Sequence, residues 1–177
     1  HETQDRAVTA LHLGGDGFIY AGFSNGKLSR FDPHNGTNLK EWDLSAGNSS
    51  PSINKIASAP NGVLLVAANS GLHVIQNDAA KQVSRHKTSD ISQFGSRACG
   101  CFHSGWSFLE MDSLMRCPEC VWAFISNVTR KGSNRCSKVA LSGPSEGWLV
   151  SAGALLRVRG DRIDTIAKDV GERITLI

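Results

Sequence analysis

The segment DGFIYAGFSNGKLSRFD, residues 16–32, decides the fold class of this 177-residue chain. Its two apolar stretches are separated by the pair Asn25-Gly26. An Asn-Gly pair between alternating apolar residues is a strong short-range signal for an antiparallel β-hairpin. Similar segments occur at residues 61–76 and 146–160, so the hairpin is one copy of a repeat.

A marker glycine precedes the apolar strand in each copy of the repeat. Successive marker glycines are 45, 43 and 42 residues apart and stand at Gly17, Gly62, Gly105 and Gly147. This interval is typical of a four-stranded propeller blade. The sequence therefore predicts an all-β fold, a β-propeller-like array of about four four-stranded antiparallel blades that forms a partial or split propeller.

The repeat also predicts the domain organisation. We expect one propeller-type domain whose units cover residues 7–50, 51–90, 91–136 and 137–177, the third being divergent and rich in cysteine. Six residues before each marker glycine stands an apolar side chain that we expect to be buried in an inner strand: Leu11, Ile56, Cys99 and Leu141.

Two stretches are compatible with either a helix or a strand. Residues 107–115 contain a capping-box pattern and apolar residues at helical spacing. Residues 163–170 also fit an amphipathic helix, but their alternation fits a strand equally well. The repeat favours the strand for the second stretch.

The stretch GKLSRFDPHNGTNLKEWDLSAGNSSPSINKIASAPNGVLLVA, residues 26–67, resembles the repeat of streptogramin-lyase-type propellers. That repeat has a glycine-hydrophobic-arginine strand, an aspartate-proline-x-x-glycine turn and a proline-x-glycine turn. The stretch is also similar to the periplasmic sensor propellers of two-component regulators. The resemblance covers residues 7–87 and 138–177 but matches residues 88–137 poorly.

The lyase resemblance implies a histidine and acidic groups that face the channel and hold a metal. The corresponding strand ends of this chain carry no acidic side chain, being Ala21-Gly22, Ala67-Ala68 and Ser151-Ala152. We therefore do not expect the lyase activity to transfer. The alternative is a propeller enzyme of lyase or lactonase type with a divalent metal in the channel, for which Asn54 and Asn69 are the plausible polar residues.

All five cysteines lie between residues 99 and 136. Two short-range cysteine pairs are typical of a zinc site, in which four ligands complete a tetrahedron. The candidate zinc ligands are Cys99, Cys101, Cys117, Cys120 and His103. Disulfides and free thiols are the alternatives, because the first pair is separated by one residue instead of the usual two to four. With zinc, residues 99–136 would form a zinc-dependent interaction module.

Composition and charge argue against several classes of function. The chain has no uninterrupted apolar run of membrane-spanning length, so we expect no membrane span. Its net charge of +3 is spread along the sequence and few aromatic residues accompany it, so we expect no nucleic-acid partner. Glycosylation sequons favour a secreted or extracytoplasmic location over a cytoplasmic one; they stand at Asn35, Asn48 and Asn127.

These observations favour a non-catalytic binding scaffold that recognises a protein or small ligand through loops at one face. Trp42 and Trp122 are the candidate contact residues, although large aromatic side chains also dominate core packing. An open array leaves an exposed edge, so we expect a protein partner or a second copy to complete the propeller.

Overall fold

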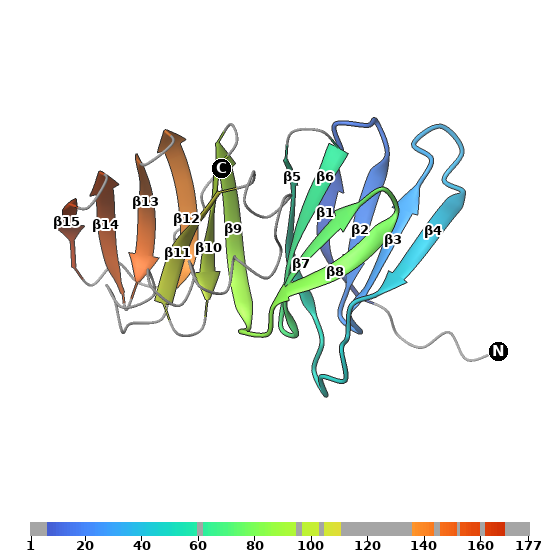
Figure 1. The fold of residues 1–177 in the computed structure, drawn as a ribbon, viewed down its shortest axis with the longest axis horizontal. Coiled ribbons are helices and arrows are strands. Elements are labelled where there is room, and N and C mark those ends of the chain that lie inside the picture. The colour runs from blue at the N-terminus through green and yellow to red at the C-terminus, as the bar shows by residue number, and fades with distance from the viewer. Residues whose placement is uncertain are drawn as a thin grey trace. The chain divides into compact units, whose positions relative to one another are not determined.

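The computed structural model describes residues 7–59, 62–94, 97–102, 105–110, 136–143, 146–151, 153–159 and 162–168. These residues form four antiparallel β-sheets and contain no α-helix (Figure 1). The predicted all-β class is confirmed. No helix in this part of the chain is long and apolar enough to cross a membrane.

Three of the sheets are four-stranded meanders, and the third sheet has three described strands. Sheet 1 contains β1 (Val8–Leu13), β2 (Ile19–Phe23), β3 (Lys27–Phe31) and β4 (Asn38–Asp43). Sheet 2 contains β5 (Ile53–Ala59), β6 (Val63–Ala68), β7 (Gly71–Gln76) and β8 (Ala79–Ser84). Sheet 3 contains β9 (Thr88–Phe94), β10 (Arg97–Phe102) and β11 (Gly105–Glu110). Sheet 4 contains β12 (Cys136–Gly143), β13 (Glu146–Ser151), β14 (Ala154–Arg159) and β15 (Arg162–Ala167).

The marker glycines are required for two different physical reasons. Gly17 and Gly62 have φ angles of 84° and 72°, which a side chain would strain. Gly147 instead lies inside β13, where a Cβ atom would come within 2.8 Å of the Ala140 carbonyl oxygen. The repeat therefore combines turns that need a left-handed residue with a close approach between neighbouring strands.

The chain divides into two compact units, His1–Thr88 and Ser89–Ile177. In the first unit one face of sheet 1 packs against sheet 2. The shared core includes Tyr20, Leu28 and Trp42 from sheet 1 and Ile56, Leu64 and Val66 from sheet 2. Each such side chain contributes about 1.5–3 kcal/mol when it is fully buried. This face-to-face contact is what fixes the positions of the loops at the sheet ends.

Polar contacts reinforce the packing of sheet 1 on sheet 2. The Trp42 indole nitrogen donates to the Asp78 carbonyl oxygen at 3.0 Å, and the Arg30 guanidinium pairs with the Asp78 carboxylate at 2.9 Å. Tyr20 stacks on Trp42 with ring centroids 6.3 Å apart. The turn between β7 and β8 is therefore tied to the neighbouring sheet.

In the second unit a buried carboxylate joins sheet 3 to sheet 4. Asp90 on β9 is 1% exposed and accepts hydrogen bonds from the Val139 amide on β12 at 2.9 Å and from the Ile91 amide at 3.0 Å. Ser92 accepts a further bond from the Leu141 amide at 3.0 Å. The cost of burying a carboxylate is offset by these backbone donors.

The expected column of buried inner-strand side chains is wrong at its first position. Leu11 is 71% exposed, whereas Ile56 is buried and Leu141 packs against the core of sheet 4. The reason is that Leu11 lies on the face of sheet 1 that points away from sheet 2. The side chain of Cys99 lies outside the described residues.

The structure shows whether a helix or a strand forms in part of each of the two ambiguous stretches. Residues 105–110 form β11, so the helix suggested for 107–115 is wrong over that overlap, and residues 111–115 lie outside the described part. Six regular cross-strand pairs with β10 replace the helical hydrogen bonds. The strand favoured for 163–170 is confirmed over β15.

Candidate functional site

An open pocket of about 520 Å³ lies in the first unit, where three separate segments meet. The β4–β5 loop, the β6–β7 turn and the segment at the end of β8 supply its lining: Ala46, Gly47, Asn48, Ser70, Gln82 and Arg85. Most of these side chains are polar, and we call this site the loop pocket.

Hydrogen bonds within the β4–β5 loop hold the wall of the loop pocket in place. The Asn48 carboxamide oxygen accepts from the Ser50 amide at 2.8 Å, and its nitrogen donates to the Asn69 carbonyl oxygen at 3.1 Å. Asn69 in turn donates to the Ser50 carbonyl oxygen at 2.8 Å. These bonds join the loop to the β6–β7 turn and pre-organise the pocket.

The floor of the loop pocket is a buried chain of hydrogen bonds around Ser70. Its hydroxyl donates to the Leu44 carbonyl oxygen at 2.6 Å and lies 2.9 Å from His73 Nε2. Because the single hydroxyl proton goes to Leu44, His73 must donate its Nε2–H to the Ser70 oxygen. Gln82 donates to the Ser70 carbonyl oxygen at 2.8 Å and completes the chain.

The distance between Ser70 and His73 is that of a nucleophile and its general base, but the hydrogen bond between them runs in the opposite direction. A general base must accept the hydroxyl proton, whereas here the imidazole is the donor. His73 is 3% exposed, and burial lowers its pKa to about 4, so the ring is neutral at physiological pH. The Ser70–His73 pair therefore has a structural role beneath the loop pocket.

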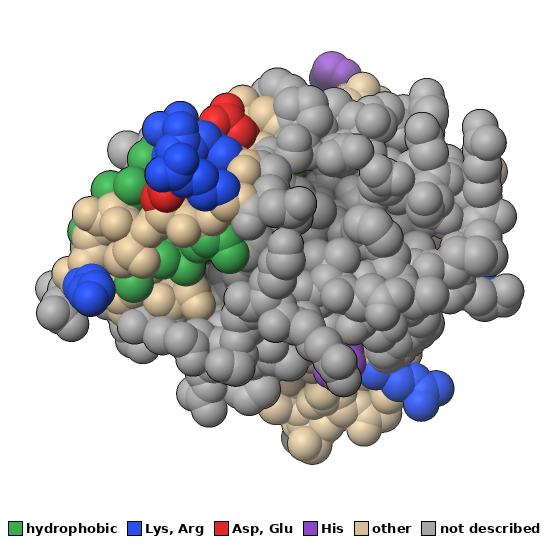
Figure 2. Space-filling view, turned by 60° about the vertical axis from the view of Figure 1, so that its left-hand side comes forward, with side chains coloured by type: hydrophobic (Ala, Val, Ile, Leu, Met, Phe, Trp, Pro, Cys, Tyr) green, Lys and Arg blue, Asp and Glu red, His purple; other side chains and the backbone are tan. Residues whose placement is uncertain are grey.

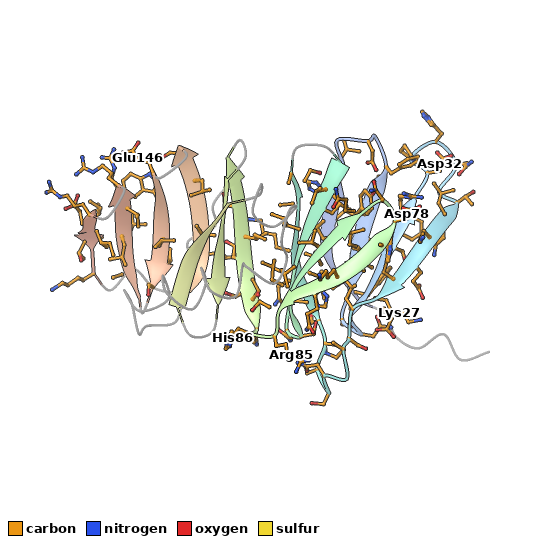
Figure 3. The ribbon with its side chains drawn as sticks, viewed as in Figure 1. Lys27, Asp32, Asp78, Arg85, His86 and Glu146 are labelled. Atoms are coloured by element: carbon orange, nitrogen blue, oxygen red, sulfur yellow. The ribbon has the colours of Figure 1, made fainter. Side chains whose placement is uncertain are left out.

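Arg85 is the cationic group of the loop pocket. It follows β8 and is exposed, and no acidic residue in the described part of the chain pairs with it. Figure 3 shows Arg85 and Lys27 toward one end of sheets 1 and 2 and Asp32 and Asp78 toward the other. Lys27 is paired with Glu41 at 2.7 Å, and Arg85 is the cation among the described residues that line the pocket.

The structure brings together the two asparagines that were considered for a divalent metal. The Asn54 amide nitrogen donates to the Asn69 side-chain oxygen at 3.1 Å and to the Thr88 carbonyl oxygen at 2.7 Å. The Asn69 oxygen that a metal would need is thus used as an acceptor. Among the described residues, no group of three His, Cys, Asp or Glu side chains is placed to hold a metal ion.

The other predicted site residues are placed as follows. Trp42 is 7% exposed and packs between sheets 1 and 2, and its role as a contact residue stays a prediction. Cys99 and Cys101 lie on β10, with backbone partners Phe108 and Trp106 on β11. The remaining candidates lie outside the described residues, and their zinc or contact role stays a prediction: His103, Cys117, Cys120 and Trp122.

Sequence reasoning missed the loop pocket. Arg85 stands in a polar stretch without a motif, and the Ser70–His73 pair spans a hairpin turn whose burial the sequence does not reveal. The one available signal was the unusual density of Asn, Ser and Gly in residues 45–54, which marks a hydrogen-bonded loop.

Comparisons with known proteins identify the fold. No protein-family model matches the chain, and the search of curated proteins found no match. Among solved structures, the chain is similar to the extracellular domain of the putative one-component system BT4673 from B. thetaiotaomicron, with 13% identity and a TM-score of 0.68 over 93% of this chain. It is similar to Raptor from Chaetomium thermophilum, with 14% identity and a TM-score of 0.62 over 94% of the chain. It is also similar to the β-propeller domain of Cps50 (Swd1) from Myceliophteria thermophila, with 12% identity and a TM-score of 0.61 over 89% of the chain.

The chain spans part of each of these structures, namely 26%, 16% and 54% of their respective lengths. At such low identity the likeness shows the fold and leaves activity and partners open. The similarity extends over both units of the chain and agrees with the meander order of the sheets. The predicted resemblance is thereby confirmed at the level of fold: the chain is an array of β-propeller blades.

Proposed function

We propose that the chain is a non-catalytic binding scaffold whose loop pocket recognises a carboxylate group of a protein or small ligand. The observation that carries this proposal is the exposed guanidinium of Arg85, which has no acidic partner in the described part of the chain and lies beside a pre-formed polar wall. A guanidinium binds a carboxylate through two parallel hydrogen bonds, which gives both orientation and affinity.

The blade sheets supply the rigid support that such a site needs. In a propeller the loops bind the ligand, and the packed strands beneath them keep the loops in fixed positions. The asparagine bonds in the β4–β5 loop and the Ser70 chain fix the pocket before a ligand arrives. A pre-organised pocket loses less conformational entropy on binding.

The orientation of the buried Ser70–His73 pair supports a binding role over a hydrolytic one. The hydroxyl proton is committed to a backbone carbonyl, and the depressed pKa of His73 reflects burial of the ring away from solvent. Among the lining residues described above, none offers an activated oxygen to a substrate. A substrate in the loop pocket would meet hydrogen-bond donors instead.

An extracytoplasmic location is part of the same proposal. Two of the similar structures are described as extracellular domains of BT4673, and the chain carries three glycosylation sequons. Oxidising conditions would favour disulfides at the cysteine-rich third unit over free thiols.

Binding is tested by an NMR titration of the isotopically labelled chain with an acetylated tri-glutamate peptide. We expect amide shifts centred on Asn48, Ser70 and Arg85, and weakening of binding by roughly ten- to hundred-fold in Arg85→Gln. Lys81→Gln is the matched control, because Lys81 is an exposed cation on β8 outside the pocket. Shifts centred on another part of the chain, or equal effects of the two variants, would overturn the proposal.

A further inference from the structure

Arg85 differs from the other arginines whose side chains the structure describes. Each of those is paired with a carboxylate: Arg30 with Asp78, Arg157 with Glu146, and Arg159 and Arg162 with Asp164. Figure 2 shows Lys and Arg side chains gathered beside Asp and Glu on one surface of the molecule. Arg85 lines the loop pocket without such a partner among the described residues, so its guanidinium is open to the carboxylate of a ligand.

The backbone of the β6–β7 turn lies directly against the backbone of Arg85. Gly71 has a φ angle of 138°, and a Cβ atom at this position would overlap the Ser84 carbonyl oxygen and come within 3.1 Å of the Arg85 Cα atom. Only glycine permits this approach. Gly71 therefore allows the cation to lie beside Ser70 and Gln82, which are joined by a hydrogen bond of 2.8 Å.

A left-handed turn brings two backbone donors to the loop pocket. Residues 45–48 form a tight turn that is closed by a hydrogen bond of 2.9 Å from the Asn48 amide to the Ser45 carbonyl oxygen. At its centre Ala46 and Gly47 have φ angles of 49° and 74°, a conformation that is uncommon for alanine. Both residues line the pocket, and their amides donate to no described residue. These N–H groups are available to an anion.

Gln82 contributes an acceptor beside these donors. Its side-chain nitrogen donates to Ser70, whereas its Oε1 accepts no hydrogen bond from a described residue. Since no side-chain oxygen of Gln82 is buried without a partner, Oε1 is open to solvent and to a ligand. An open acceptor next to a guanidinium favours a ligand that carries an N–H group close to its carboxylate.

We infer that the loop pocket binds the C-terminal carboxylate of a peptide chain, an inference that rests on the carboxylate recognition proposed above. The terminal carboxylate and the last N–H group are attached to the same Cα atom, so a chain end presents both groups together. Arg85 and the amides of Ala46 and Gly47 bind the carboxylate, and Gln82 Oε1 accepts from the N–H group. In an aspartate or glutamate side chain, at least one further carbon separates the carboxylate from the backbone N–H group.

The shape of the loop pocket also fits the end of a chain. Its volume of about 520 Å³ is that of a site for a small ligand, and its mouth is open. The last residue can therefore enter while the preceding residues leave toward solvent. Because the lining is mostly polar, we expect recognition to depend on the backbone groups of the ligand and little on its last side chain.

The test compares three ligands in NMR titrations of the isotopically labelled full chain. They are acetyl-alanyl-alanine with a free C-terminus, the same peptide methylated on its last nitrogen, and acetyl-glutamate N-methylamide, which has only a side-chain carboxylate. We expect the first to bind roughly ten-fold more tightly than the other two, because they lose the hydrogen bond to Gln82. Its amide shifts should centre on Gly47, Gln82 and Arg85.

A variant shows whether Gln82 is the source of this preference. In Gln82→Leu the free and the methylated peptide should bind equally, because the acceptor is gone. The ratio of the two affinities is measured within one protein, so a general weakening of the pocket through the lost bond to Ser70 does not affect it. Circular dichroism verifies that the variant folds. Lys81→Gln is the matched control and should keep the preference, because Lys81 is an exposed residue of β8 outside the pocket.

The outcomes separate this inference from the proposed function. Equal binding of the free C-terminus and the side-chain carboxylate at the loop pocket would overturn the inference and leave carboxylate recognition standing. A ten-fold preference that persists in Gln82→Leu would also overturn it. Absence of binding by all three ligands would refute both the inference and the proposed function.

Discussion

The buried imidazole of His73 makes a quantitative prediction about stability and pH. Its pKa is about 4 in the folded chain, whereas an unfolded histidine titrates near 6.5. Between these two values the unfolded state binds a proton that the folded state does not. Stability is therefore fully present above about pH 6.5 and is lost as the pH falls toward 4.

The expected loss follows from the separation of the two pKa values. Lowering the pH from 7 to 5 should reduce the free energy of unfolding by about 2 kcal/mol through His73 alone. Other groups titrate in the same range, and burial lowers the pKa of His12 in the same direction. The difference between the wild type and a variant isolates the part that belongs to His73.

His73→Gln is the informative variant, because glutamine can still donate to Ser70 but does not titrate. Urea unfolding followed by tryptophan fluorescence gives the free energy at each pH. We expect the wild type to lose about 2 kcal/mol more than the variant between pH 7 and 5. Parallel curves for the two proteins would refute the neutral, donating imidazole and with it the description of the pocket floor.

Three further predictions concern separate parts of the molecule. Asp90→Ala should lower the free energy of unfolding by about 1–3 kcal/mol, measured by urea unfolding, because the buried Val139 amide loses its acceptor. Trp42→Phe should cost about 1 kcal/mol or more in the same assay through loss of the bond to Asp78, and an unchanged midpoint would contradict that contact. Native mass spectrometry before and after chelation and reduction should show whether the third unit carries a zinc ion, disulfides or free thiols. A zinc mass that chelator removes is the outcome expected for a site at Cys99, Cys101, Cys117, Cys120 and His103.

The architecture was predictable because its determinants are local. Turn pairs such as Asn25-Gly26 and alternating apolar strands recur at a fixed interval, and each copy pairs its own strands. The exposure of Leu11 was not predictable in the same way. The sequence around it resembles that around Ile56, which is buried through the packing of sheet 2 on sheet 1.

The loop pocket escaped sequence reasoning for a related reason. Its lining comes from three segments that meet through the packing of sheet 1 on sheet 2, and no spacing in the sequence encodes that meeting. The burial of Ser70 and His73 could not be predicted, because polar residues in a hairpin are normally exposed to solvent. Sequence reasoning selected Trp42 for its size, and size is also what places it in the core.

Face-to-face packing of sheet 1 on sheet 2 is the claim on which the loop pocket depends. Nuclear Overhauser contacts between the Tyr20 ring and the methyl groups of sheet 2 test it most directly. The account predicts cross-peaks from Tyr20 to core methyl groups of sheet 2, such as those of Ile56 and Leu64, together with regular antiparallel contacts inside each sheet. Intact sheets without any cross-peak between sheets 1 and 2 would contradict it.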